Sequence, residues 1–296
     1  MIIKKDKIKS IIYIIVSLGI SFLVPWIFYW QVDIGVYNYI LDTVKEADRF
    51  EVYTKWYINY NWLLLVFEFL INIFMTSIFL KCILKLSFKN IKGWFSLQKV
   101  NELVIGLLLG AITISTVFFL LLLTENANVV SYQPHFTPDA LKYLLIFTLV
   151  GFSEELFYRG FIITSLRTFK NRFFVIMFSG IIFSLAHIFN NEFNLMSFLN
   201  IMLIGIVFAY MFTKTKSLWM PTGFHILWNY FQGNVYGFNV SGLGIQGIFT
   251  TEYKTDNIFN GGAFGPEGGL VVTLVTLITM LVLKWYLTKT KNVSDI

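Results

Sequence analysis

The stretch Gly151-Phe-Ser-Glu-Glu-Leu-Phe-Tyr-Arg-Gly160 places three charged residues inside a segment that otherwise reads as membrane-spanning. It follows the apolar run 143–150 and precedes the apolar residues 161–163. A charge near the centre of a bilayer costs on the order of 3 kcal/mol or more, so charged residues there are expected to have partners and a function. The stretch therefore predicts a helical membrane fold that encloses a polar site.

The composition is that of a polytopic membrane protein. Hydrophobic residues make up 56% of the 296 residues and charged residues only 14%, whereas soluble domains carry about 25% charged residues. The single cysteine, Cys82, excludes an intramolecular disulfide and a cysteine metal cluster. The net charge of +6 comes from basic residues that gather on one side of the predicted membrane spans. We therefore do not expect a nucleic-acid partner.

Hydrophobic runs long enough to cross about 30 Å of hydrocarbon recur along the chain. We predict an all-α, polytopic transmembrane bundle of about eight spans, at 11–29, 61–80, 103–123, 142–166, 173–189, 195–212, 218–232 and 270–287. The seventh, 218–232, is short for a span and is expected to end part-way or to continue into 235–238. Residues 32–57 are polar and acidic, which predicts an exterior loop with at most a short helix. Residues 239–269 are Gly-rich and predict a loop that is a candidate cap for a cavity.

The placement of Lys and Arg predicts the orientation of the chain. Basic residues gather at both termini and in the even-numbered connections. The opposite side holds only Lys45, Arg49, Lys55, Lys142 and Lys254. This positive-inside pattern predicts that both termini are cytoplasmic and that the protein is a multi-pass protein of the cell membrane.

Polar residues recur at helical spacing on three of the predicted spans. They are Glu154, Glu155 and Arg159 in 142–166, His187 in 173–189, and His225 and Asn229 in 218–232, and Phe183 lies four residues before His187. Glu155 and Arg159 are four residues apart, so they share a helix face and can form an ion pair. Helix rise predicts similar depths for Glu154 and His225, while His187 needs a tilted or shortened span to reach them.

Such side chains suit the hydrolysis of an amide bond if they converge. A carboxylate beside imidazoles can act as a general base for water. Two imidazoles and a carboxylate can instead hold Zn²⁺ and leave an open position for water. An Asn amide or an imidazolium can stabilise the oxyanion of acyl transfer. No Ser or Cys nucleophile is required.

The motifs Glu154-Glu155-x-x-x-Arg159, Phe183-x-x-x-His187 and His225-x-x-x-Asn229 resemble, in order, the three motifs of the CPBP family. This family comprises CAAX proteases and bacteriocin-processing enzymes and is also called the Abi family. The resemblance covers roughly 141–236, which we treat as a catalytic core between an N-terminal part, 1–140, and a C-terminal part, 237–296. It implies an intramembrane endopeptidase that acts on a peptide or membrane-protein substrate.

The resemblance also implies a role for each motif residue. Glu154 would activate water, and His187 and His225 would polarise it. Asn229 would stabilise the oxyanion or assist a ligand, and the Glu155–Arg159 pair would support the site from behind. If Zn²⁺ is bound, Glu154, His187 and His225 are the expected ligands; a metal-independent mechanism is the alternative.

Other interpretations stay open at this point. The chain can act by binding alone, as a membrane regulator of a sensor kinase or as a bacteriocin self-immunity protein, roles associated with the family. A proton-coupled transporter is disfavoured because no inverted repeat is apparent. The carboxylate pair can also be a packing device, and Asn229 can be a hydrogen-bonding contact between helices. Glu68 has no motif context, and His135 is expected to be solvated in an exterior loop.

Overall fold

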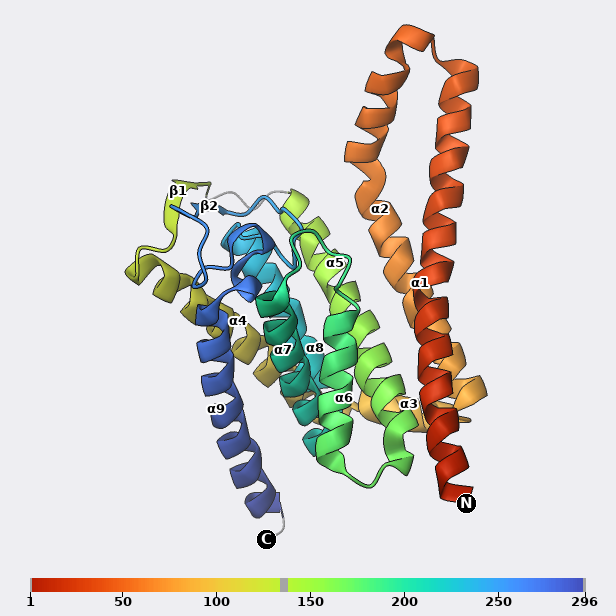
Figure 1. The fold of residues 1–296 in the computed structure, drawn as a ribbon, viewed down its shortest axis with the longest axis vertical. Coiled ribbons are helices and arrows are strands. Elements are labelled where there is room, and N and C mark those ends of the chain that lie inside the picture. Colours follow the sequence, from red (N-terminus) through yellow and green to blue (C-terminus); the bar gives the residue numbers. More distant parts are fainter. Residues whose placement is uncertain (1, 134–137, 295–296) are drawn as a thin grey trace.

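A computed structural model describes residues 2–133 and 138–294 and shows an all-α bundle, as the sequence predicts (Figure 1). Its helices are α1 (Ile2–Thr43), α2 (Arg49–Ile78), α3 (Phe88–Trp94), α4 (Val100–Leu123), α5 (Pro138–Glu155), α6 (Arg172–Leu185), α7 (Leu195–Thr215), α8 (Trp219–Tyr230) and α9 (Leu270–Ser294). A short antiparallel sheet pairs β1 (Asn128–Tyr132) with β2 (Phe249–Glu252).

Several helices continue into wider π turns. α2 continues as η2 (Phe79–Ile83), α5 as η4 (Leu156–Ile163) and α8 as η6 (Phe231–Val235). Turns of this type are rare and often mark functional sites. η4 follows Glu155 directly, so the charged stretch changes from α-helical to π-helical geometry between its carboxylates and its arginine.

Five helical segments are long and apolar enough to cross a membrane: Asp6–Thr43, Glu46–Ile83, Phe88–Leu123, Leu195–Thr215 and Leu270–Lys289. α6 is apolar but shorter. The continuous helix formed by α5 and η4 carries the three charges of the opening stretch, which lower its hydropathy. Figure 1 shows that α1 begins and α9 ends at the same end of the bundle. The count of eight spans and the cytoplasmic side of that end stay predictions.

The prediction of a loop at 32–57 is wrong. α1 runs to Thr43 and α2 begins at Arg49, so the two helices form a long hairpin that projects beyond the rest of the bundle (Figure 1). Arg49 closes the turn, because its Nε donates to the carbonyl oxygen of Val44 at 3.0 Å and its Nη2 to that of Leu41 at 2.8 Å. Most polar residues of this segment are exposed, either on the two helices or in the short turn between them, and polarity alone does not distinguish an exposed helix surface from a loop.

α8 lies at the centre of the bundle, packed against α4 and α5. Glycines bring α4 and α8 together: a Cβ at Gly106 would lie 2.1 Å from the carbonyl oxygen of Met220, and one at Gly110 would lie 2.2 Å from that of Phe224. Only a residue without a side chain permits such close approach, as is common where membrane helices pack. This contact fixes the part of α8 that carries His225.

Candidate active site

A cavity of about 320 Å³ lies between α1, α2, α5, α7, α8 and the C-terminal end of α6, and the Gly-rich loop lines part of it. Four of the six predicted site residues line it: Glu154, His187, His225 and Asn229. The other two, Glu155 and Arg159, lie behind its wall and are fully buried. The structure therefore brings the three motifs together. Ser241 and Glu267 from the Gly-rich loop also contribute to the lining, so the loop lies at the cavity as expected, while its role as a cap stays a prediction.

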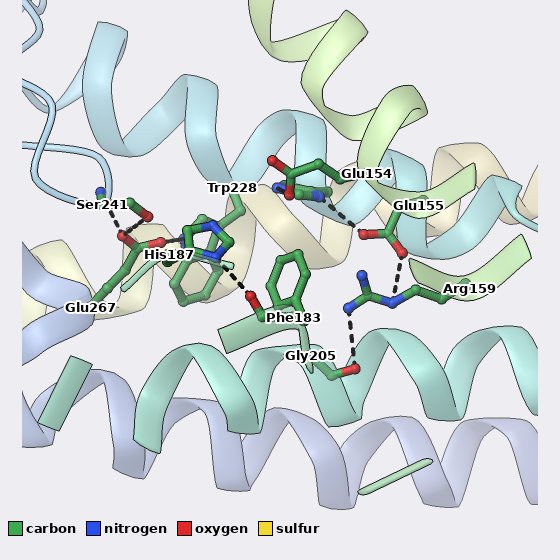
Figure 2. A network of polar contacts seen from close by, with 10 residues as sticks. Glu154, Glu155, Arg159, Phe183, His187, Gly205, Trp228, Ser241 and Glu267 are labelled. Carbon is green, nitrogen blue, oxygen red and sulfur yellow. Dashed lines mark hydrogen bonds and ion pairs between the residues drawn. The ribbon is translucent and has the colours of Figure 1, made fainter. Parts of the chain in front are cut away.

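Glu155 is the buried centre of the polar network in Figure 2. Its Oε2 lies 3.1 Å from Arg159 Nε, and its Oε1 lies 3.1 Å from His225 Nδ1. The ion pair expected from the four-residue spacing is thus present. The same carboxylate also holds an imidazole on a second helix, a contact that spacing along one helix does not predict.

Arg159 connects this network to α6 and α7. Its Nη2 donates to the carbonyl oxygen of Gly205 at 3.2 Å. The guanidinium also lies 4.3 Å from the ring centroid of Phe183 and 5.1 Å from that of Phe208. Aromatic faces attract a desolvated cation, so the charge is compensated by the Glu155 carboxylate, a carbonyl and two rings. Phe183 therefore contacts the supporting arginine as well as lining the cavity.

Glu154 faces the cavity instead of the buried pair. Its side chain is 21% exposed, and its Oε2 lies 3.8 Å from His225 Nε2, which is too far for a direct hydrogen bond. Oε2 accepts no hydrogen bond from the described residues. A covered carboxylate oxygen without a partner is costly to stability and calls for an explanation. A water molecule or a substrate in the cavity would supply the missing hydrogen bond.

The contacts of the two histidines define their tautomers. His187 Nδ1 lies 2.8 Å from the carbonyl oxygen of Phe183, and a carbonyl can only accept, so Nδ1 carries the proton. The same reasoning applies to His225 Nδ1 beside the Glu155 carboxylate. In the neutral form of either ring the lone pair is then on Nε2, the nitrogen left for the cavity. His187 lies in the turn after α6. Because α6 ends at Leu185, the helix is shorter than the predicted fifth span, 173–189.

The expected zinc ligands do not form a metal site. Within the described part of the chain, no group of three His, Cys, Asp or Glu side chains can hold a metal ion. Glu154 and His225 approach each other, but His187 does not complete a set of three with them. The donor set therefore does not fit Zn²⁺ in this arrangement, and the function proposed below uses no metal.

Two further carboxylates line the cavity. Glu267, from the loop before α9, accepts from Trp228 Nε1 at 3.3 Å and from the Ser241 backbone N–H and hydroxyl at 2.8 Å each (Figure 2). Sequence reasoning missed Glu267; the available signal was an acidic residue in a Gly-Pro-rich turn directly before an apolar span. The other carboxylate is that of Glu68 on α2, which belongs to none of the three motifs. His135 lies outside the described residues.

Residues 136–231 match the family model described as Type II CAAX prenyl endopeptidase Rce1-like. The match covers about a third of the chain, from the beginning of α5 to the start of η6, and includes every predicted site residue. No curated protein and no solved structure matches the chain significantly. The family match confirms the resemblance to CPBP proteases over this segment, and it suggests an intramembrane endopeptidase of the CAAX type.

Proposed function

We propose that this chain is an intramembrane endopeptidase in which Glu154 activates a water molecule for attack on a peptide carbonyl. The observation that carries the proposal is the environment of His225. Glu155 holds its Nδ1 from behind the cavity wall, while Glu154 faces its Nε2 from the cavity at 3.8 Å. A water beside both groups can donate one hydrogen bond to the carboxylate and the other to the imidazole lone pair.

The chemistry then follows from the groups that meet this water. Glu154 takes a proton from it as general base, and the oxygen forms a bond to the carbonyl carbon. The Asn229 amide donates to the oxyanion that develops, and His187 does so when its Nε2 is protonated. Cleavage of the C–N bond releases an amine, which receives the proton from Glu154. Glu155 and Arg159 act as positioning residues because neither lines the cavity.

The family match suggests the substrate class to test first, a membrane-bound peptide with a prenylated Cys-aliphatic-aliphatic-X end. The cavity is suited to an apolar group, since Leu18 and Phe22 of α1 and Leu65 and Phe69 of α2 line it. Matched peptides with and without the prenyl group, presented in lipid vesicles to the reconstituted protein, will show whether the lipid is required.

Glu154→Gln tests the mechanism, because it keeps the shape of the side chain and removes the base. We expect kcat to fall by about 10²–10⁴ in a protein that remains folded and inserted. The control is Glu125→Gln, which removes an exposed carboxylate bound to Lys254 at 2.8 Å and should leave kcat unchanged. Full cleavage by a folded Glu154→Gln protein would refute the proposed base.

The same variant separates the enzyme from a protein that acts by binding. A binding protein should keep its cellular phenotype when Glu154 is replaced by Gln, whereas a protease should lose it. The family match suggests an endopeptidase and does not suggest a sensor-kinase partner or a self-immunity role.

A further inference from the structure

A second pocket, of about 530 Å³, shares no lining residue with the cavity described above. Its walls are α3, the segment 163–170 that leads into α6, the first turn of α6 and the last turn of α7. Figure 1 places the connection into α6 and the last turn of α7 at the end of the bundle where α1 begins. The floor is apolar and buried, with Leu166, Val175 and Phe212 exposed by 8% or less.

The rim of this pocket is strongly basic. Arg167, Lys170, Arg172 and Lys216 all line it, and no acidic residue does. All four side chains are exposed, and no salt bridge joins the first three to a carboxylate among the described residues. Lys7 of α1 adds another cation, since its Nζ lies 5.2 Å from the ring centroid of Phe169, which also lines the pocket.

We propose that this pocket binds an anionic phospholipid from the leaflet on the side of the chain termini, with the headgroup at the basic rim and acyl chain against the apolar floor. The positive-inside pattern explains basic residues at helix ends, but it does not predict a concave apolar surface beneath them. Basic pockets between membrane helices on the cytoplasmic side bind anionic headgroups. A soluble anion would use the rim alone and would leave the apolar floor unfilled.

Native mass spectrometry of the full chain in detergent, titrated with phosphatidylglycerol or with phosphatidylcholine, tests this proposal. The double variant Arg167→Gln/Lys170→Gln should weaken phosphatidylglycerol binding about tenfold or more, because each basic residue near a headgroup contributes measurably to affinity. The control Lys284→Gln/Lys289→Gln removes the same charge from α9 and should change affinity less than about threefold. Thermal unfolding confirms that both proteins are folded.

A second variant tests the apolar part of the site without altering charge. Thr213→Trp fills the pocket from its half-buried wall and should also weaken phosphatidylglycerol binding, while inorganic phosphate should not displace the lipid. Three results would each overturn the proposal: equal affinity for the two lipids, an equal loss in the rim and α9 variants, or displacement by phosphate.

Discussion

At the scale of single residues, substitutions of the two adjacent carboxylates are expected to differ in their effect on protein stability. Glu155 is fully buried between Arg159 and His225, whereas Glu154 is 21% exposed and faces the cavity. Breaking a buried ion pair by removing one partner costs about 3–5 kcal/mol, because the other charge is left uncompensated. We therefore expect Glu155→Gln to lower both the midpoint of thermal unfolding and kcat.

Glu154→Gln is the matched control for this prediction, since the two residues are neighbours and the substitution is identical. It should lower kcat without lowering the free energy of unfolding, because the Glu154 carboxylate is partly exposed and its Oε2 accepts no hydrogen bond from the described residues. Unfolding curves in detergent and initial rates of peptide cleavage, measured on both variants, provide the comparison. Equal stability of the two variants would contradict the supporting role assigned to Glu155.

Residue spacing could pair only residues whose relation is local, whereas the meeting of the three motifs was expected from their depths and from the family resemblance. Glu155 and Arg159 could be paired because four residues make almost one helical turn. The contact between Glu155 and His225 joins residues on α5 and α8, and helix periodicity does not say which faces of separate helices meet. Glu267 was missed for the same reason, because its partners Trp228 and Ser241 are brought to it by the path of a loop.

At the scale of elements, the α1–α2 hairpin shows how a polar segment can be helical. Arg49 donates to the carbonyl oxygen of Leu41 in the last turn of α1 and to that of Val44 directly after it, where carbonyls lack partners within the helix. Its positive charge also complements the negative end of the helix dipole. Arg49→Ala should therefore destabilise the tip of the hairpin by about 1 kcal/mol, seen as faster hydrogen exchange of the amides around residues 40–50.

Lys55→Ala is the control for the hairpin prediction. Its ammonium group pairs with Glu51 at 2.6 Å on an exposed helix face, and exposed pairs of this kind contribute about 0.3–0.5 kcal/mol. The exchange rates at the tip should therefore change little. A comparable increase in both variants would show that the tip responds to any loss of positive charge and not to the loss of the Arg49 hydrogen bonds.

At the scale of the whole molecule, the site depends on how closely α8 can approach its neighbours. His225 can contact Glu155 only if α8 lies deep in the bundle, and the glycines of α4 allow that depth. A Cβ at Gly110 would meet the carbonyl oxygen of Phe224, the residue before His225, at 2.2 Å. Backbone atoms cannot move aside as a flexible side chain can. The helices must separate, or α8 must shift along α4.

Gly110→Ala is therefore expected to affect stability and catalysis together. Overpacking of this kind costs about 1–3 kcal/mol, and displacement of α8 should lengthen the contact from His225 to Glu155 and lower kcat. The control is Gly19→Ala in α1, where an added Cβ would meet nothing within 4 Å. There, alanine should raise helix stability by up to about 1 kcal/mol and leave kcat unchanged. If the two alanine variants unfold and cleave alike, the close packing of α4 on α8 does not position the site.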